Sequence, residues 1–123
     1  MLRKFLDKDK CGKVCKATVF GEQIFVEKMR GQLDEFVWGF LRKNMKVHPH
    51  MHSQKETYVF LDGRGVMRVG EKEFAVGKGD VVYIEPNVIH TAWNNCDCDL
   101  EFIILRTKKL AYFRAIAAIL SRR

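Results

Sequence analysis

The stretch HPHMHSQKETYVFLDG, residues 48–63, decides the fold, because it joins a run of alternating histidines to a run with the alternation of a β-strand. Alternate side chains of a strand project from the same face, so His50 and His52 are expected to point together. If the chain bends at residues 53–55, Glu56 can open the next strand on that same face. The spacing therefore predicts two imidazoles and one carboxylate around a common point.

These side chains are of the kinds that bind divalent transition metals. Neutral imidazole and carboxylate suit iron, manganese, nickel, cobalt, copper and zinc, and two histidines with one carboxylate leave coordination positions open for chemistry. The only histidine outside the run is His90, which follows the turn at residues 85–87 and opens another strand-like run at 90–94. An antiparallel barrel could bring His90 to the same interior.

Both segments resemble the two motifs of the cupin family. The stretch quoted above matches the first motif, H-x-H-x-x-x-E followed by a glycine, with His50, His52, Glu56 and Gly63 in the matching places. GDVVYIEPNVIHTAWN, residues 79–94, resembles the second motif, with Gly79, Asp80, His90 and Asn94 in register. Two motifs with fitting spacing are far more specific than an isolated H-x-H.

The sequence departs from the motifs at turns. Asn44 stands where the first motif often has glycine, and Glu85 stands where the second has proline, with Pro86 one place later. Asn87 replaces a glycine of the second motif. Asparagine tolerates left-handed backbone better than most residues, so we expect Asn87 to make the glycine's turn.

The resemblance covers about residues 30–106 and implies an all-β cupin jelly-roll β-barrel. It also implies one divalent metal ion per chain, held by His50, His52, Glu56 and His90, with the metal's identity open. The alternative is a metal-free pocket in which the histidines are hydrogen-bonded.

Outside the motifs, the chain between residues 17 and 106 is a succession of short apolar or alternating runs separated by turn residues, which is typical of an antiparallel barrel. We expect a basic N-terminal extension at 1–16, the barrel at 17–106, and a short C-terminal amphipathic α-helix within 107–123 that packs on the barrel or on a partner chain. Its apolar face comprises Leu110, Phe113, Ile116, Ala117 and Leu120. The strands are expected at 17–20, 23–29, 34–41, 45–50, 56–61, 65–69, 72–76, 80–85, 90–94 and 100–106.

Composition narrows the class of protein. The chain has 123 residues, 47% hydrophobic and 30% charged, as expected for one globular domain. Its longest apolar run is too short to span a bilayer, so we expect a cytoplasmic protein without a membrane partner. The net charge is +7, but the 22 lysines and arginines are scattered without interleaved stacking aromatics, which argues against nucleic-acid binding.

The four cysteines form two close pairs, Cys11 with Cys15 and Cys96 with Cys98. We expect no disulfide framework, because nothing marks the chain as secreted. A four-cysteine zinc site is conceivable, although such sites typically use C-x-x-C spacing. Free thiols are the alternative.

Other side chains are expected near the site. His48 shares the parity of His50, so it lies either in the pocket as an acid or base, or on the rim at the start of the strand. Tyr58 and its neighbour Phe60 follow Glu56 on its face and are expected to line the cavity, where the Tyr58 hydroxyl can orient a substrate. Phe36 and Trp38 are further candidates for the cavity wall.

Three classes of function fit this arrangement. The first is a small-molecule enzyme, dioxygenase-like or isomerase-like, that uses the open metal positions. The second is a non-catalytic small-molecule or sugar-binding sensor, and the third is a structural or metal-storage protein. A terminal amphipathic helix also favours a homodimer.

Overall fold

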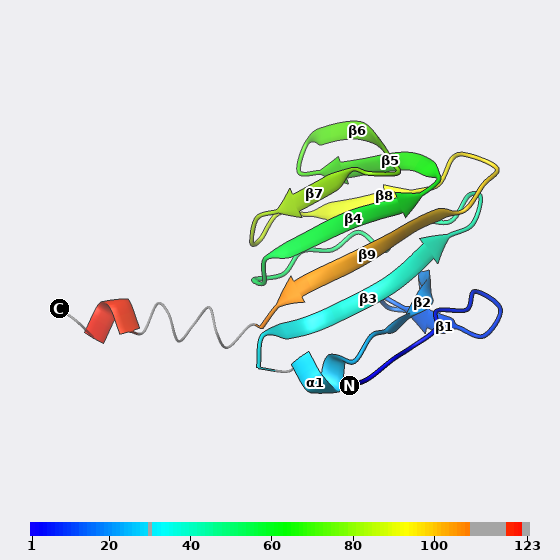
Figure 1. Ribbon diagram of the computed structural model, residues 1–123. Helices are drawn as coiled ribbons and strands as arrows, with labels where there is room; N and C mark the ends of the chain where they lie inside the picture. The colour runs from blue at the N-terminus through cyan, green and yellow to red at the C-terminus, as the bar shows by residue number, and fades with distance from the viewer. Residues whose placement is uncertain (30, 109–117, 122–123) are drawn as a thin grey trace.

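Antiparallel pairing joins every strand of the molecule to its neighbours in one of two sheets (Figure 1). The computed structural model describes residues 1–29, 31–108 and 118–121. The larger sheet has the order β1-β2-β3-β9-β4-β7, formed by Gly12–Val14, Val19–Gln23, Leu33–Leu41, Leu100–Thr107, Glu56–Asp62 and Val81–Ile84. The smaller sheet has the order β6-β5-β8, formed by Lys72–Gly77, Arg64–Val69 and His90–Trp93.

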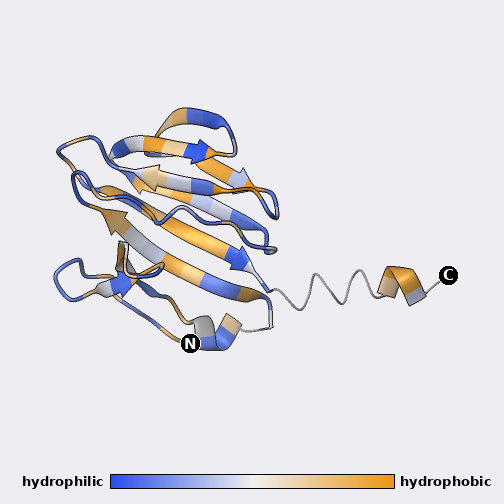
Figure 2. Cartoon of the chain, turned by 180° about the vertical axis from the view of Figure 1, so that it is seen from behind, coloured by the Kyte–Doolittle hydropathy of each residue, from blue (hydrophilic) through white to orange (hydrophobic). Residues whose placement is uncertain are grey.

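The main core combines inward-facing side chains from both sheets. Along β4, Glu56, Tyr58 and Phe60 are buried while the residues between them are half-buried, so the period of two expected from the sequence is confirmed. In Figure 2 the long strands of the larger sheet instead carry continuous hydrophobic stretches, because apolar side chains cover both faces of this sheet. This core is contributed by β2, β3, β4, β5, β6, β7, β8 and β9. The expected all-β jelly-roll barrel is therefore confirmed.

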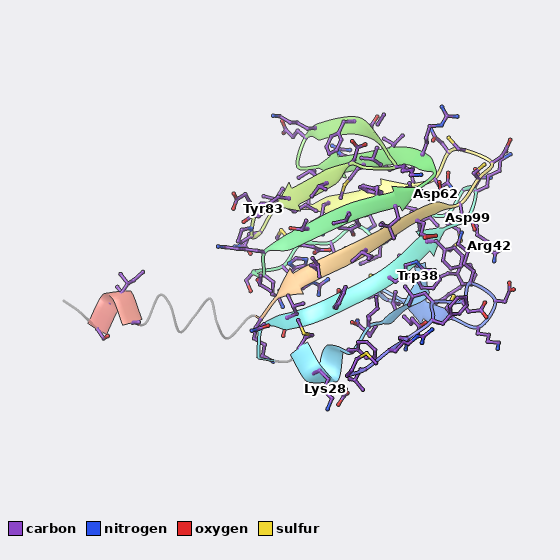
Figure 3. All side chains as sticks on the ribbon, viewed as in Figure 1. Lys28, Trp38, Arg42, Asp62, Tyr83 and Asp99 are labelled. Carbon is purple, nitrogen blue, oxygen red and sulfur yellow. The ribbon has the colours of Figure 1, made fainter. Side chains whose placement is uncertain are left out.

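The outer face of the larger sheet is covered by a second apolar cluster, centred on Ile24, Trp38 and Phe40. Leu6 of the N-terminal segment packs against it. Trp38 lies on the side of β3 that faces the β1–β2 hairpin (Figure 3). The prediction that Phe36 and Trp38 line the cavity is therefore wrong, because even-numbered residues of β3 point away from the main core.

Two turns lie where the sequence has asparagine in place of a glycine of the cupin motifs, and both have the left-handed backbone that glycine commonly adopts. Asn44 has φ of 66° and Asn87 has φ of 63°, so both asparagines occupy the left-handed region, as expected for Asn87. Gly63, between β4 and β5, has φ of 81°, and a Cβ there would lie 2.0 Å from the Asp99 carbonyl oxygen. No other residue fits at position 63 without moving the chain.

Three expected strands differ in the structure. The run at 23–29 ends its strand at Gln23 and continues as the short helix α1, Val26–Met29. The first strand pair begins upstream of residue 17, because Gly12–Val14 already pairs with β2. The run at 45–50 makes only two isolated bridges, both to β8, and Pro49 within it has no N–H to donate.

Residues 118–121 are helical, which confirms a short C-terminal helix, and they are exposed in the single chain. The expected helix positions at 109–117 and 122–123 lie outside the described residues. Within the described part of the chain, no helix has the length and apolarity needed to cross a membrane.

Candidate metal centre

The first motif lies on an irregular segment that leads from β3 into β4. Pro49 and Met51 are exposed, whereas His50 and His52 are half-buried, so the two histidines share a face as expected. Glu56 is the first residue of β4 and is only 1% exposed. The first motif therefore delivers three polar side chains to one end of the barrel interior.

His90 reaches these groups through backbone pairing. The His50 N–H donates to the His90 carbonyl at 3.2 Å and the His90 N–H donates to the His50 carbonyl at 3.0 Å. Their ring centroids consequently lie 4.4 Å apart. The turn before β8 is also attached to the first motif, because the Asn87 N–H donates to the His52 carbonyl at 2.7 Å.

The potential ligand atoms of His50, His52, Glu56 and His90 all lie within 4.8 Å of one another. That spread is little more than twice a metal–nitrogen bond of about 2.1 Å. Among the described residues, this is the only group of three or more histidine, cysteine or acidic side chains with such spacing. All four predicted metal ligands are therefore brought together.

Each imidazole is oriented by a backbone carbonyl two residues away. Nδ1 of His50 bonds the His48 oxygen, Nδ1 of His52 lies 3.0 Å from the Gln54 oxygen, and Nδ1 of His90 lies 2.9 Å from the Val88 oxygen. A carbonyl oxygen only accepts, so each Nδ1 carries a proton, and once His52 Nε2 gives up the proton that it donates to Glu56 Oε2, each Nε2 has a lone pair. This is the tautomer that binds a metal through Nε2.

Two buried atoms at the centre have no hydrogen-bond partner among the described residues, namely Glu56 Oε1 and His90 Nε2. Buried polar atoms are rarely left without a partner, because that costs about 1–3 kcal/mol each. A cation bonded to both atoms would satisfy them. The donor set, its spacing and these two atoms all fit a divalent transition metal.

Electrostatics favour the protonation states that a metal needs. Burial alone would raise the pKa of Glu56, but the hydrogen bond from His52, the nearby His90 ring and the charge of Arg106 outweigh it and lower that pKa strongly. Burial lowers the pKa of His50, against the opposing bond to the His48 carbonyl. The carboxylate is thus charged and the His50 ring neutral near pH 7.

A pair of charged residues that the sequence did not reveal lies beside the ligands. Arg106 of β9 is flanked by Glu35 of β3 and Glu56 of β4, because both are its partners in the sheet register. Its Nη2 lies 3.2 Å from Glu35 Oε2, and its Nε lies 3.6 Å from Glu56 Oε2. Burial raises the pKa of Glu35, opposed in part by Arg106. In the sequence, the only sign of this pair is that Glu35 and Arg106 each occupy an inward-facing position of an alternating run. Only the pairing of β3 with β9 shows that the two side chains meet.

A cavity of about 360 Å³ opens next to the ligands. His50 and His52 form part of its wall, and the wall also includes Cys15, Lys16, Glu35, His48, Met51 and Arg106. His48 therefore lines the cavity, with its ring 6.2 Å from that of His50.

Tyr58 lies deeper than the cavity wall and is fully buried. Its ring centroid is 6.4 Å from that of His90, and its hydroxyl has no hydrogen-bond partner within the described residues. Tyr58 packs against Phe60 and Phe102. A catalytic role for Tyr58 or His48 stays a prediction.

The cysteines do not form a second metal site. All four are free, and none belongs to the cluster of potential ligands found in the described residues. Burial and the nearby Glu35 raise the pKa of Cys15 to about 12, so this thiol stays protonated beside the cavity. The free-thiol alternative is the one that the structure supports.

Comparison with known proteins identifies the family. Residues 40–106, more than half of the chain, match the cupin domain. The chain therefore belongs to the cupin family. Its two motifs form the ligand cluster described above, on the jelly-roll barrel that the family resemblance implied.

One curated relative matches part of the chain. An uncharacterized protein of Methanocaldococcus jannaschii is 40% identical over 57 residues, which are 46% of this chain and 45% of that protein. The match thus spans less than half the length of this relative.

Two solved structures cover most of the chain. A Cupin 2 conserved barrel domain protein from Salinispora arenicola superposes with a TM-score of 0.78 at 17% identity, over 96% of this chain and 98% of that one. A predicted oxalate decarboxylase from Thermotoga maritima gives a TM-score of 0.74 at 21% identity, over 85% and 99% of the two chains. At these identities the likeness concerns the fold alone.

Proposed function

We propose that the protein is a divalent-metal-dependent enzyme that acts on a small molecule in the barrel cavity, with chemistry of the dioxygenase or isomerase kind. The observation that carries this proposal is the convergence of His50, His52, Glu56 and His90 with every Nδ1 fixed by a backbone carbonyl. A metal bound there would polarise a substrate oxygen as a Lewis acid or, if redox-active, support electron transfer.

The surroundings support a reacting site over a purely structural one. The cavity gives a small molecule access to the face of the cluster that His50 and His52 present. The cluster also offers four protein ligands, as structural zinc sites do, but the cavity beside it leaves room for a further, exchangeable ligand on a metal of higher coordination number. His48 and Arg106 lie on the same wall and supply polar groups to whatever binds.

Metal analysis of the purified protein tests the site. His52→Ala and Glu56→Ala should each lower the metal retained after dialysis by roughly tenfold or more. Replacing a residue that only hydrogen-bonds a ligand already costs about tenfold in metal affinity, and removing a ligand itself costs more. His48→Ala is the matched control and should retain metal, because its ring lies beside the cluster without belonging to it. Unchanged metal content in both ligand variants would refute the site.

Turnover separates the enzyme from the non-catalytic sensor. Oxygen consumption and substrate conversion are measured on protein loaded with iron(II), manganese or nickel, with His52→Ala as the inactive control. Tight binding of small molecules without turnover for any metal would favour the sensor alternative.

Assembly and location belong to the same proposal. A homodimer would cover the exposed Ile119 and Leu120 of the C-terminal helix, and light scattering of the purified chain tests it. Free cysteines throughout suit the reducing cytoplasm in which we place the protein.

A further inference from the structure

We propose that the cavity beside the metal centre is a subsite for a small carboxylic acid, with Arg106 and Lys16 as the cations that bind its carboxylate. This inference rests on the proposed function, because the acid would bind next to the metal. It names the class of substrate that the cavity is built to take.

The first argument is the position of Arg106. Its guanidinium lies between Glu35 and the metal ligand Glu56, so it touches the cluster on one side and lines the cavity on the other. Arg106 Nε is buried and makes no hydrogen bond within the described residues, although guanidinium has five N–H donors. Because Arg106 lines the cavity together with His50 and His52, a ligand there can lie against both the guanidinium and the metal.

The second argument is charge. Lys16 is exposed at the cavity wall and adds a second positive charge to that of Arg106. Glu35 and Glu56 are the acidic residues of the wall and the cluster. With a divalent metal bound, positive charges exceed negative ones by at least two, whether or not Glu35 is ionised. This excess favours an anionic ligand in the cavity.

The third argument is geometry. The planar guanidinium fork matches a carboxylate, and the ion pair to Glu35 fixes the fork in place. A volume of about 360 Å³ is at the small end of ligand cavities, which run from about 300 to 1,000 Å³. The arrangement favours a compact acid that places its carboxylate against Arg106 and an oxygen toward the metal.

The test compares two ligands of equal size, pyruvate and its neutral amide pyruvamide, by calorimetric titration of zinc-loaded protein. Zinc has no redox chemistry, so binding is measured without oxidation. Arg106→Gln should weaken pyruvate binding by roughly tenfold or more, because a charge-assisted hydrogen bond is lost, and should leave pyruvamide within about twofold. Lys16→Gln should weaken pyruvate binding by a smaller factor.

Arg64→Gln is the matched control, since Arg64 is exposed and does not line the cavity, and both affinities should stay unchanged. Equal losses for pyruvate and pyruvamide, or no loss for pyruvate, would overturn the carboxylate subsite. Tighter binding of inorganic phosphate than of any small carboxylate would overturn the ligand class.

Two further outcomes are distinguishable. If Arg106→Gln does not fold, Arg106→Lys and Lys16→Gln decide the question. Arg106→Lys keeps the positive charge and should still bind pyruvate more tightly than pyruvamide. Lys16 is exposed, so Lys16→Gln leaves the core intact. Zinc content is measured first. A wild-type chain that holds no zinc or other divalent metal refutes the proposed function, whereas a zinc-loaded chain without carboxylate preference refutes only the subsite.

Discussion

Replacing Tyr58 with phenylalanine should stabilise the metal-free protein. The Tyr58 side chain is fully buried, and its hydroxyl has no hydrogen-bond partner in the described part of the chain. A buried hydroxyl without a partner costs about 1–3 kcal/mol, and phenylalanine keeps the ring that packs on Phe60 and Phe102. We therefore expect the free energy of unfolding to rise by about 1–2 kcal/mol.

Urea denaturation and calorimetry of the metal-free chain measure this change. For a domain of this size, about 1 kcal/mol corresponds to roughly 4 °C in the melting temperature. Tyr83→Phe is the matched control: Tyr83 is 46% exposed and its hydroxyl donates to Glu85 at 3.3 Å, so its effect should stay within about 0.5 kcal/mol.

A loss of more than about 1 kcal/mol in Tyr58→Phe would refute this reasoning, because the hydroxyl would then have a partner worth keeping. The same variant tests the catalytic role predicted from the sequence. Activity that falls while metal content is unchanged would confirm that the Tyr58 hydroxyl contacts the substrate, and unchanged activity would restrict Tyr58 to packing.

Two further measurements concern the motifs and the metal. Asn94→Ala removes bonds that the side-chain amide donates to the Leu41 and Cys98 carbonyls at 2.9 and 2.7 Å, and one that it accepts from the Cys96 N–H at 2.9 Å. We expect a loss of about 3 kcal/mol by urea denaturation, at about 1 kcal/mol per bond, with exposed Asn95→Ala as control. Zinc at a hundredfold its dissociation constant should add about 2.7 kcal/mol of stability that a chelator removes, and His52→Ala should show none of this gain.

Most of the metal centre could be predicted from the sequence because three of its four ligands lie within seven consecutive residues. The alternation of His50 and His52 and the position of Glu56 at the start of a strand follow from a period of two over nine residues. His90 was placed by the second motif, whose turn the structure makes with left-handed Asn87.

The pair of Glu35 and Arg106 could not be predicted in the same way. These residues are far apart in the chain, and they meet only because β3 pairs with β9 in one particular register. A slip of one residue in either strand would turn that strand's side chain to the other face and separate the pair. The same kind of error placed Trp38 in the cavity wall, since parity within a run does not say which face becomes the interior.

The mutual backbone bonds of His50 and His90 give metal binding a role in holding the chain together. A metal bonded to both rings would tie together two points about forty residues apart, enclosing β4, β5, β6 and β7 in one closed loop. Because the four ligands meet only in the folded chain, the bound metal would oppose opening of this loop and delay the separation of the two sheets. Exchange of backbone amide hydrogens in the enclosed strands would then slow on metal addition, even at amides remote from the ligands.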